Sequence, residues 1–132
     1  MTMTISDLMQ RNTVTVDMDD TAEKVEALFA RHGLSWAPVR DKDGPVVGVV
    51  SRSDLDRLRG QGRDGATVPA WQVCSYHPIA AEPGEDVAEV ARRMVERHVH
   101  HVVVMQGERL LGVVSALDFV RLYAQAGSPA AG

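Results

Sequence analysis

The chain has 132 residues, of which 45% are hydrophobic and 24% charged, and its formal net charge is -4 at pH 7. This length suits one compact domain or two half-sized units that share a core, and the composition is that of a soluble globular protein. The acidic balance excludes bulk attraction to nucleic acid or anionic lipid, so neither is expected as a partner. The start lacks a basic region followed by an apolar one, so we expect a cytoplasmic protein with no membrane attachment.

The first half of the chain predicts one β-α-β-β-α unit, which we bound at residues 5–60. Its elements are expected at 13–16 (extended), from the N-cap Thr21 (helix), at 37–39 and 46–50 (a hairpin) and from about 53 to 59 (helix). The apolar residues of the first helix recur at helical spacing and predict a buried stripe, Ala22, Val25, Leu28 and Phe29.

Residues 61–70 are polar and glycine-rich at their start and are expected to form a linker. A second unit of the same order follows, which we bound at 71–126, and residues 127–132 are expected to be a flexible tail. Its elements are expected at 78–81, from the N-cap Asp86, at 102–105, at 110–114 and from about 117 to 125. The helix that starts at Asp86 carries the matching stripe Val87, Val90, Ala91, Met94 and Val95.

The two halves are copies of one unit. An offset of 65 residues aligns Val25 with Val90, and an offset of 64, after a one-residue shift in the hairpin turn, aligns residues 48–51 with 112–115. A repeat of this length indicates a supersecondary unit that must pack on its twin to cover its apolar face.

The sequence Gly-Val-Val-Ser-x-x-Asp occurs twice, at 48–54 and 112–118, where a strand is expected to turn into a helix. One interpretation is a capping box, in which the Ser caps the helix and the Asp returns a hydrogen bond. The other is a ligand site, in which the Ser and the free N–H groups of the helix start bind phosphate and the Asp accepts from two sugar hydroxyls. Spacing alone leaves both open.

The tandem β-α-β-β-α unit, the opening Ser6–Met9, the segment Ala37–Val39 and the doubled corner together resemble a pair of CBS repeats, also called a Bateman module. The resemblance implies an α+β fold of tandem CBS repeats packed about a pseudo-twofold axis. It further implies two clefts that hold an adenosine nucleotide such as AMP, ADP or ATP as a regulatory ligand, with no cofactor required. A stand-alone pair of this kind is expected to act on an unidentified regulated protein.

The same resemblance implies the roles of single residues. Ser51 and Ser115 would meet phosphate, and Asp54 and Asp118 would hold the ribose hydroxyls. The base would lie near the first strand of each repeat, at Val14, Thr15, Ile79 and Ala80.

The second repeat also carries His100 and His101 in a stretch that resembles the family segment beside nucleotide phosphates. The first repeat has Ser35 and Trp36 at the matching positions, so the two clefts are expected to differ. Arg52, next to the first corner, is a further candidate for phosphate because guanidinium suits phosphate oxygens.

Other site classes are not indicated. His98 and His100 are too few for a structural metal site, so no metal is expected. The lone Cys74 permits no internal disulfide and is expected in the core. Neither a nucleophile elbow nor a Walker-type loop is present, so an enzyme is not expected.

The resemblance implies a homodimer formed through the helices. The alternatives are a ligand-free interaction scaffold and a sensor of another adenosyl ligand, NAD or S-adenosylmethionine.

Overall fold

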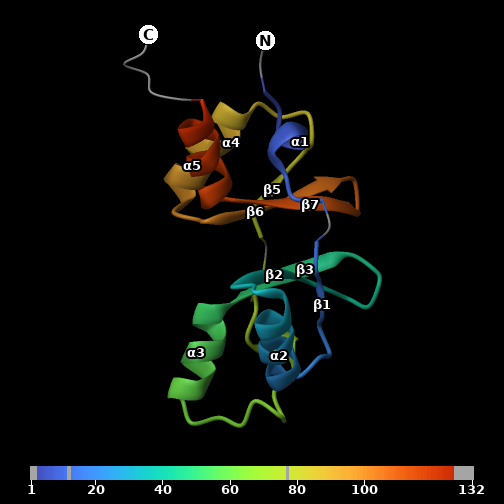
Figure 1. The fold of residues 1–132 in the computed structure, drawn as a ribbon. Coiled ribbons are helices and arrows are strands. Elements are labelled where there is room, and N and C mark those ends of the chain that lie inside the picture. Colours follow the sequence, from blue (N-terminus) through green and yellow to red (C-terminus); the bar gives the residue numbers. More distant parts are fainter. Residues whose placement is uncertain (1–2, 12, 77, 127–132) are drawn as a thin grey trace. The chain divides into compact units, whose positions relative to one another are not determined.

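The computed structural model describes residues 3–11, 13–76 and 78–126, and the predicted tail at 127–132 lies outside the described residues. The chain divides into two compact units (Figure 1). The first-repeat unit is Thr13–Pro78, and the second-repeat unit combines Met1–Asn12 with Ile79–Gly132. Each contains one sheet and its helices, which confirms the predicted α+β class.

The first-repeat unit has the predicted β-α-β-β-α order followed by two short elements. In chain order these are β1 (Val16–Asp17), α2 (Ala22–His32), β2 (Trp36–Arg40), β3 (Val46–Ser51), α3 (Arg52–Gly60), the 3-10 helix η1 (Ala70–Gln72) and β4 (Ser75–Tyr76). The sheet has the order β1-β2-β3-β4, in which β1 and β2 are parallel and the other pairs antiparallel. The expected N-cap is confirmed, because the Thr21 side chain accepts a hydrogen bond from Lys24 N at 3.2 Å.

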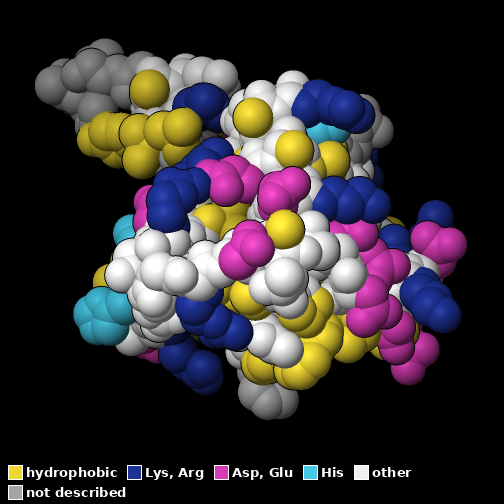
Figure 2. Space-filling model, turned by 90° about the horizontal axis from the view of Figure 1, so that it is seen from below, with side chains coloured by type: hydrophobic (Ala, Val, Ile, Leu, Met, Phe, Trp, Pro, Cys, Tyr) yellow, Lys and Arg dark blue, Asp and Glu magenta, His cyan; other side chains and the backbone are white. Residues whose placement is uncertain are grey.

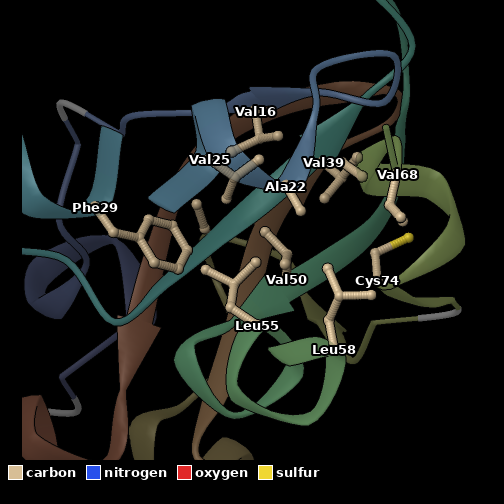
Figure 3. Close-up of a cluster of buried hydrophobic side chains, with 12 residues drawn as sticks. Val16, Ala22, Val25, Phe29, Val39, Val50, Leu55, Leu58, Val68 and Cys74 are labelled. Carbon is tan, nitrogen blue, oxygen red and sulfur yellow. The ribbon is translucent and has the colours of Figure 1, made fainter. Parts of the chain in front are cut away.

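The core of this unit lies where the two helices cover the sheet (Figure 3). Val25 and Phe29 of α2 are buried, as the helical spacing predicts. Val68 and Cys74 belong to the same cluster, which confirms the expected burial of the cysteine. The end of the predicted linker thus packs in the core, where Val68 O accepts a hydrogen bond from Ala22 N at the start of α2 at 2.8 Å.

The second-repeat unit repeats the order with one additional helix at its start. Its elements are α1 (Ile5–Leu8), β5 (Ala80–Ala81), α4 (Val87–Arg97), β6 (His101–Gln106), β7 (Arg109–Ser115) and α5 (Ala116–Gln125). The strand order is β5-β6-β7, and Gln10 adds an isolated antiparallel bridge to Val113. The predicted N-cap Asp86 accepts from Glu89 N at 3.3 Å and is confirmed.

The segment that precedes each repeat packs with the other repeat. β4, which leads into the second repeat, pairs with β3 of the first-repeat unit, while Gln10, which leads into the first, pairs with β7. Both approaches are close: a Cβ on Gly48 would lie 2.4 Å from Ser75 O, and one on Gly112 would lie 2.4 Å from Gln10 O. The glycine of each doubled corner therefore makes room for the exchanged segment.

The predicted buried stripe of α4 is wrong at one position. Val90 and Met94 are buried, but Val95 is 74% exposed. A helix turns about 100° per residue, so Val95 points well away from the direction of Met94 and leaves the side that faces the sheet. Apolar periodicity alone does not distinguish the edge of the stripe from its centre.

Candidate functional site

The first corner lies where β3 passes into α3. Ser51 is extended (φ -125°, ψ 165°) and caps the helix, with its Oγ accepting from Asp54 N at 3.3 Å. In return, Asp54 Oδ2 accepts from Ser51 N at 2.8 Å and from Ser51 Oγ at 3.0 Å. Asp54 is 6% exposed, so this carboxylate is held within the fold.

The second corner, between β7 and α5, has the same geometry. Ser115 Oγ accepts from Asp118 N at 3.4 Å, and Asp118 Oδ2 accepts from Ser115 N at 2.8 Å and from Ser115 Oγ at 3.2 Å. The capping-box interpretation is therefore confirmed in both units. It leaves one oxygen, Oδ1, of each aspartate outside the box.

The two Oδ1 atoms have different partners. Arg57 Nη1 donates to Asp54 Oδ1 at 3.2 Å, whereas Gln10 Nε2 donates to Asp118 Oδ1 at 3.2 Å. Arg121 Nη1 lies 3.7 Å from the same Asp118 oxygen. A ribose hydroxyl that binds either aspartate must share or replace these donors.

Gln10, Arg57 and Arg121 are absent from the residues predicted for the site. Arg57 and Arg121 occupy equivalent positions of the repeats, and this identity was the available signal. Gln10 gives no such signal, because it lies 108 residues from Asp118 and reaches it only through the exchange of leading segments.

The histidines of the second repeat lie at the second corner. His101 begins β6 and pairs with Ser115 of β7, and His100 O accepts from Ala116 N at 2.8 Å. The hairpin thus brings both histidines to the start of α5.

The matching end of the first-repeat hairpin carries no imidazole. Trp36 pairs with Ser51, and Ser35 O accepts from Arg52 N at 2.8 Å. The register confirms the predicted equivalence of Ser35 and Trp36 with His100 and His101. The difference between the two clefts stays a prediction.

The pKa of His101 lies well below the ordinary value of a histidine, which is about 6.5. The pKa of His101 is lowered to about 4, chiefly by desolvation on burial and also by the neighbouring His100, while the charge of Asp118 acts in the opposite direction. His101 is therefore neutral at pH 7.

The Arg52 side chain lies against α2. Its Nη1 is 3.6 Å from Glu26 Oε1, and its guanidinium stands 5.7 Å from the centre of the Phe29 ring. These contacts place the guanidinium against α2, and the role of Arg52 in binding phosphate stays a prediction.

The predicted base-binding residues lie beside the first strands. Val14 and Thr15 precede β1 and are partly buried, Ile79 precedes β5, and Ala80 begins β5 with an exposed side chain. Ile79 O already accepts from Val103 N at 3.0 Å. Their role in binding a base stays a prediction.

The described residues contain no group of three or more His, Cys, Asp or Glu side chains placed to hold a metal ion. Within the same residues no helix is long and apolar enough to cross a membrane. Figure 2 shows acidic and basic side chains interspersed on one face, with no large region of a single sign.

Comparison with known proteins gives a consistent result. A family model described as "CBS domain" matches residues 5–60 and 70–125. The fold is similar to the crystal structure of the CBS domain pair of protein MJ0100 in complex with 5'-methylthioadenosine and S-adenosyl-L-methionine. The TM-score is 0.86 at 20% identity, over 95% of this chain and 98% of that chain.

Curated relatives share the sequence over part of their length. Inosine-5'-monophosphate dehydrogenase of Mycobacterium tuberculosis is 30% identical over 115 residues, which are 86% of this chain and 21% of that protein. The 5'-AMP-activated protein kinase subunit gamma-3 of Sus scrofa is 31% identical over 112 residues, 77% of this chain and 22% of that protein. The chain spans 32%, 42% and 13% of three further relatives.

Proposed function

The chain belongs to the CBS domain family, and on that premise we propose that it is a regulatory module that binds an adenosine nucleotide. Ser51 with Asp54, and Ser115 with Asp118, are the proposed contacts for phosphate and ribose. The observation that carries the proposal is the doubled corner: in each unit a helix start presents a hydroxyl and an aspartate that is fixed by backbone hydrogen bonds.

The relatives support an adenosine ligand. The CBS pair of MJ0100 was crystallised with two adenosyl compounds, and the kinase subunit is named for activation by 5'-AMP. The chain matches about a fifth of the kinase subunit, so only the nucleotide-binding role is carried over into the proposal. We propose a regulatory role without catalysis, exerted on a partner protein.

One observation favours an adenosyl ligand without phosphate, such as S-adenosylmethionine, as the second candidate. His101 is neutral at pH 7, and the Arg52 guanidinium is held at Glu26 and Phe29. The two residues predicted to supply positive charge to phosphate, His101 and Arg52, therefore contribute little of it, and charge-assisted hydrogen bonds strengthen phosphate binding.

A ligand-free scaffold is the third candidate. It is favoured by the capping boxes, in which both oxygens of Asp118 have donors from within the chain. In that case the corners serve only to start α3 and α5.

A titration separates the three candidates. The full chain is mixed with AMP, ADP, ATP, NAD or S-adenosylmethionine over a range of concentrations, and the melting temperature is followed. A nucleotide sensor is stabilised in proportion to the logarithm of nucleotide concentration, and an adenosyl sensor by S-adenosylmethionine. If none of the five compounds raises the melting temperature, ligand binding is contradicted and the ligand-free scaffold is the candidate that remains.

The matched variants are Asp54→Asn, Asp118→Asn and Asp56→Asn. Asp56 lies on α3 beside the first corner, is 57% exposed and serves as the control. We expect calorimetry to show weaker binding in the first two variants and unchanged binding in the third. Equal affinity in all three well-folded variants contradicts the ribose role of the corner aspartates.

The resemblance and the apolar helices also support the proposal that the chain is a homodimer. Light scattering tests it, since the monomer mass is 14.4 kDa. A measured mass that stays near this value at all concentrations up to about 1 mM contradicts a dimer, because even a dissociation constant of that size would populate dimers at 1 mM.

A further inference from the structure

The second-repeat unit holds a pocket between α4 and α5, two helices that lie on the same side of its sheet (Figure 1). The volume of this pocket, which we call the α4–α5 pocket, is about 430 Å³. Its lining is apolar except for two histidines, and it includes Ala91, Met94, Val99, Ala116 and Phe119. A cleft of this size and character is typical of sites that bind small organic molecules.

In the first-repeat unit an arginine side chain lies at the equivalent place. The guanidinium of Arg52 stands 5.7 Å from the centre of the Phe29 ring, and its Nη1 lies 3.6 Å from Glu26 Oε1. The side chain that starts at one helix thus covers the other, and the ion pair holds it there.

The second repeat lacks this filling. By the repeat offsets, the residues at the places of Glu26, Arg52 and Phe29 are Ala91, Ala116 and Met94. Both members of the ion pair are therefore cut back to a methyl group, while the equivalent backbone is kept. The α4–α5 pocket is the space that the arginine covers in the other copy.

Two imidazoles stand at the rim of the pocket. His98 ends α4 in the left-handed conformation, with φ 54°, where the first repeat has Gly33 at φ 64°. Residues with a Cβ rarely adopt this conformation, so glycine is the ordinary residue at such a helix end. The histidine replaces it and lines the pocket together with His100, and both side chains are exposed.

The rim offers a ligand hydrogen-bond donors more than acceptors. The last carbonyls of α4 are already engaged, because Met94 O accepts from Val99 N at 3.1 Å and Val95 O from His98 N at 3.3 Å. No acid lines the pocket, and α5 begins there at Ala116, so the positive end of its dipole lies close by. A carboxylate suits this rim better than a cation does.

The walls suit a flat apolar body. Phe119 provides an aromatic ring and Met94 a thioether, and both make favourable contacts with aromatic rings. The planar guanidinium of Arg52 shows that a flat group fits between the paired helices of this repeat.

We propose that the α4–α5 pocket is a second ligand site, which binds a small aromatic carboxylate with its ring between the helices and its carboxylate at His98. The lining shares His100 with the proposed nucleotide contacts but includes neither Ser115 nor Asp118, so the site is separate from the doubled corners. The proposal goes beyond the adenosine ligand and does not depend on it.

The probe is 2-naphthoate, and the full chain is titrated by calorimetry and by backbone amide shifts. A molecule with about 13 non-hydrogen atoms should have a dissociation constant of about 0.1–1 mM. 2-Naphthylmethanol and 2-naphthylmethylamine have the same rings with a neutral and a cationic head. We expect the carboxylate to bind at least threefold more tightly than the alcohol and the amine to bind most weakly. Tighter binding of the amine overturns the assignment of the head group.

Three variants locate the site. Ala91→Glu with Ala116→Arg introduces the ion pair of the first repeat and should weaken naphthoate binding at least tenfold. His98→Gly removes a rim imidazole and suits the backbone; we expect a loss of about threefold for naphthoate and none for the alcohol, since one donor to a charged head is lost. The control is Leu117→Ser, an exposed residue outside the lining that takes the identity of Ser53, and its affinity should be unchanged.

Circular dichroism verifies the fold of each variant. A folded Ala91→Glu, Ala116→Arg protein that binds naphthoate as the wild type does overturns the site. If this variant does not fold, equal naphthoate affinity in His98→Gly and the wild type overturns it instead.

Two further outcomes distinguish other occupants of the pocket. Displacement of naphthoate by AMP would assign the pocket to the nucleotide site and overturn its separateness. If none of the three naphthalenes binds the wild type, the proposal is overturned, and amide shifts at the pocket that change with protein concentration would then identify a second copy as the occupant. The nucleotide titration is read separately, so failure of either proposal is recognised independently.

Discussion

Gln10 donates a hydrogen bond through Nε2 to Oδ1 of Asp118 at 3.2 Å, across 108 residues of sequence. The contact joins the segment that leads into the first repeat to the corner of the second. At the matching place in the first-repeat unit stands Ser75, which pairs with Val49 as Gln10 pairs with Val113. In the first-repeat unit Arg57 donates to Asp54 instead. The hydrogen-bond donor to Oδ1 is therefore charged at the first corner and neutral at the second.

Replacing Gln10 by Ala removes this donor. Because a net hydrogen bond contributes about 0.5–1.5 kcal/mol, we expect the free energy of unfolding to fall by about 1 kcal/mol. Urea denaturation measures the change, with Gln106→Ala at an exposed position as the control. Equal losses in the two variants would show that the contact with Asp118 does not stabilise the fold.

Asp118→Ala removes a carboxylate that is 5% exposed and accepts from Ser115 N, Ser115 Oγ and Gln10. We expect a loss of about 2–3 kcal/mol, because a buried charged acceptor contributes more than an exposed cap. Arg121→Ala removes only a 3.7 Å ion pair from an exposed side chain and should cost under about 0.5 kcal/mol. A similar cost for both substitutions in urea denaturation would contradict the importance of the capping box.

The glycines of the corners are expected to tolerate no side chain. In Gly48→Ala and Gly112→Ala the new Cβ would lie 2.4 Å from a backbone oxygen of the exchanged segment, so we expect a loss of about 2–3 kcal/mol or more. Gly84→Ala is the control, because nothing lies within 4 Å of its Cβ position. Thermal unfolding distinguishes them, and a neutral Gly112→Ala would contradict the close packing of residues 9 and 10 on β7.

Stability should fall in acid because of His101. Its pKa is about 4 in the folded chain and about 6.5 when unfolded, so the unfolded chain binds the proton more readily. The stabilisation is complete above pH 6.5 and is lost as the pH falls toward 4. Since the side chain is only partly buried, the loss should be well below the full value of about 1.4 kcal/mol per pKa unit.

The measurement is the free energy of unfolding at pH 7 and pH 5 for the wild type, His101→Gln and His32→Gln. His32 is exposed at the end of α2 and serves as the control. We expect His101→Gln to be less sensitive to this change of pH than the other two proteins. Identical sensitivity would show that His101 is not the group responsible.

Nucleotide affinity should depend on pH through the same side chain. A bound phosphate raises the pKa of His101 from its free value of about 4, so binding strengthens as the pH falls through the bound-state pKa. The second phosphate pKa, near 6, acts in the opposite direction by reducing the charge of the ligand. Calorimetry at pH 6 and pH 8 therefore needs the His100→Gln, His101→Gln double variant for comparison. The same affinity ratio in both proteins would mean that these histidines do not touch phosphate.

The sequence by itself determined the repeated unit. The buried stripe with Val25 and Phe29 and the two Ser–Asp corners depend on contacts within one helical turn or one hairpin. The residues that make such contacts are close together in the sequence, so their spacing predicts them. The register of Trp36 with Ser51 and of His101 with Ser115 follows from the same repeat.

Only the tertiary structure decided what lies across long separations. The Gln10 contact to Asp118, the burial of Val68 at the end of the predicted linker, the lowered pKa of His101 and the exposure of Val95 all depend on which segments pack together. The spacing of apolar residues along a helix shows which of them share a side, but not which of them another segment covers. The physical reason is that burial and electrostatic environment are properties of the packed surroundings, whereas spacing is a property of the chain.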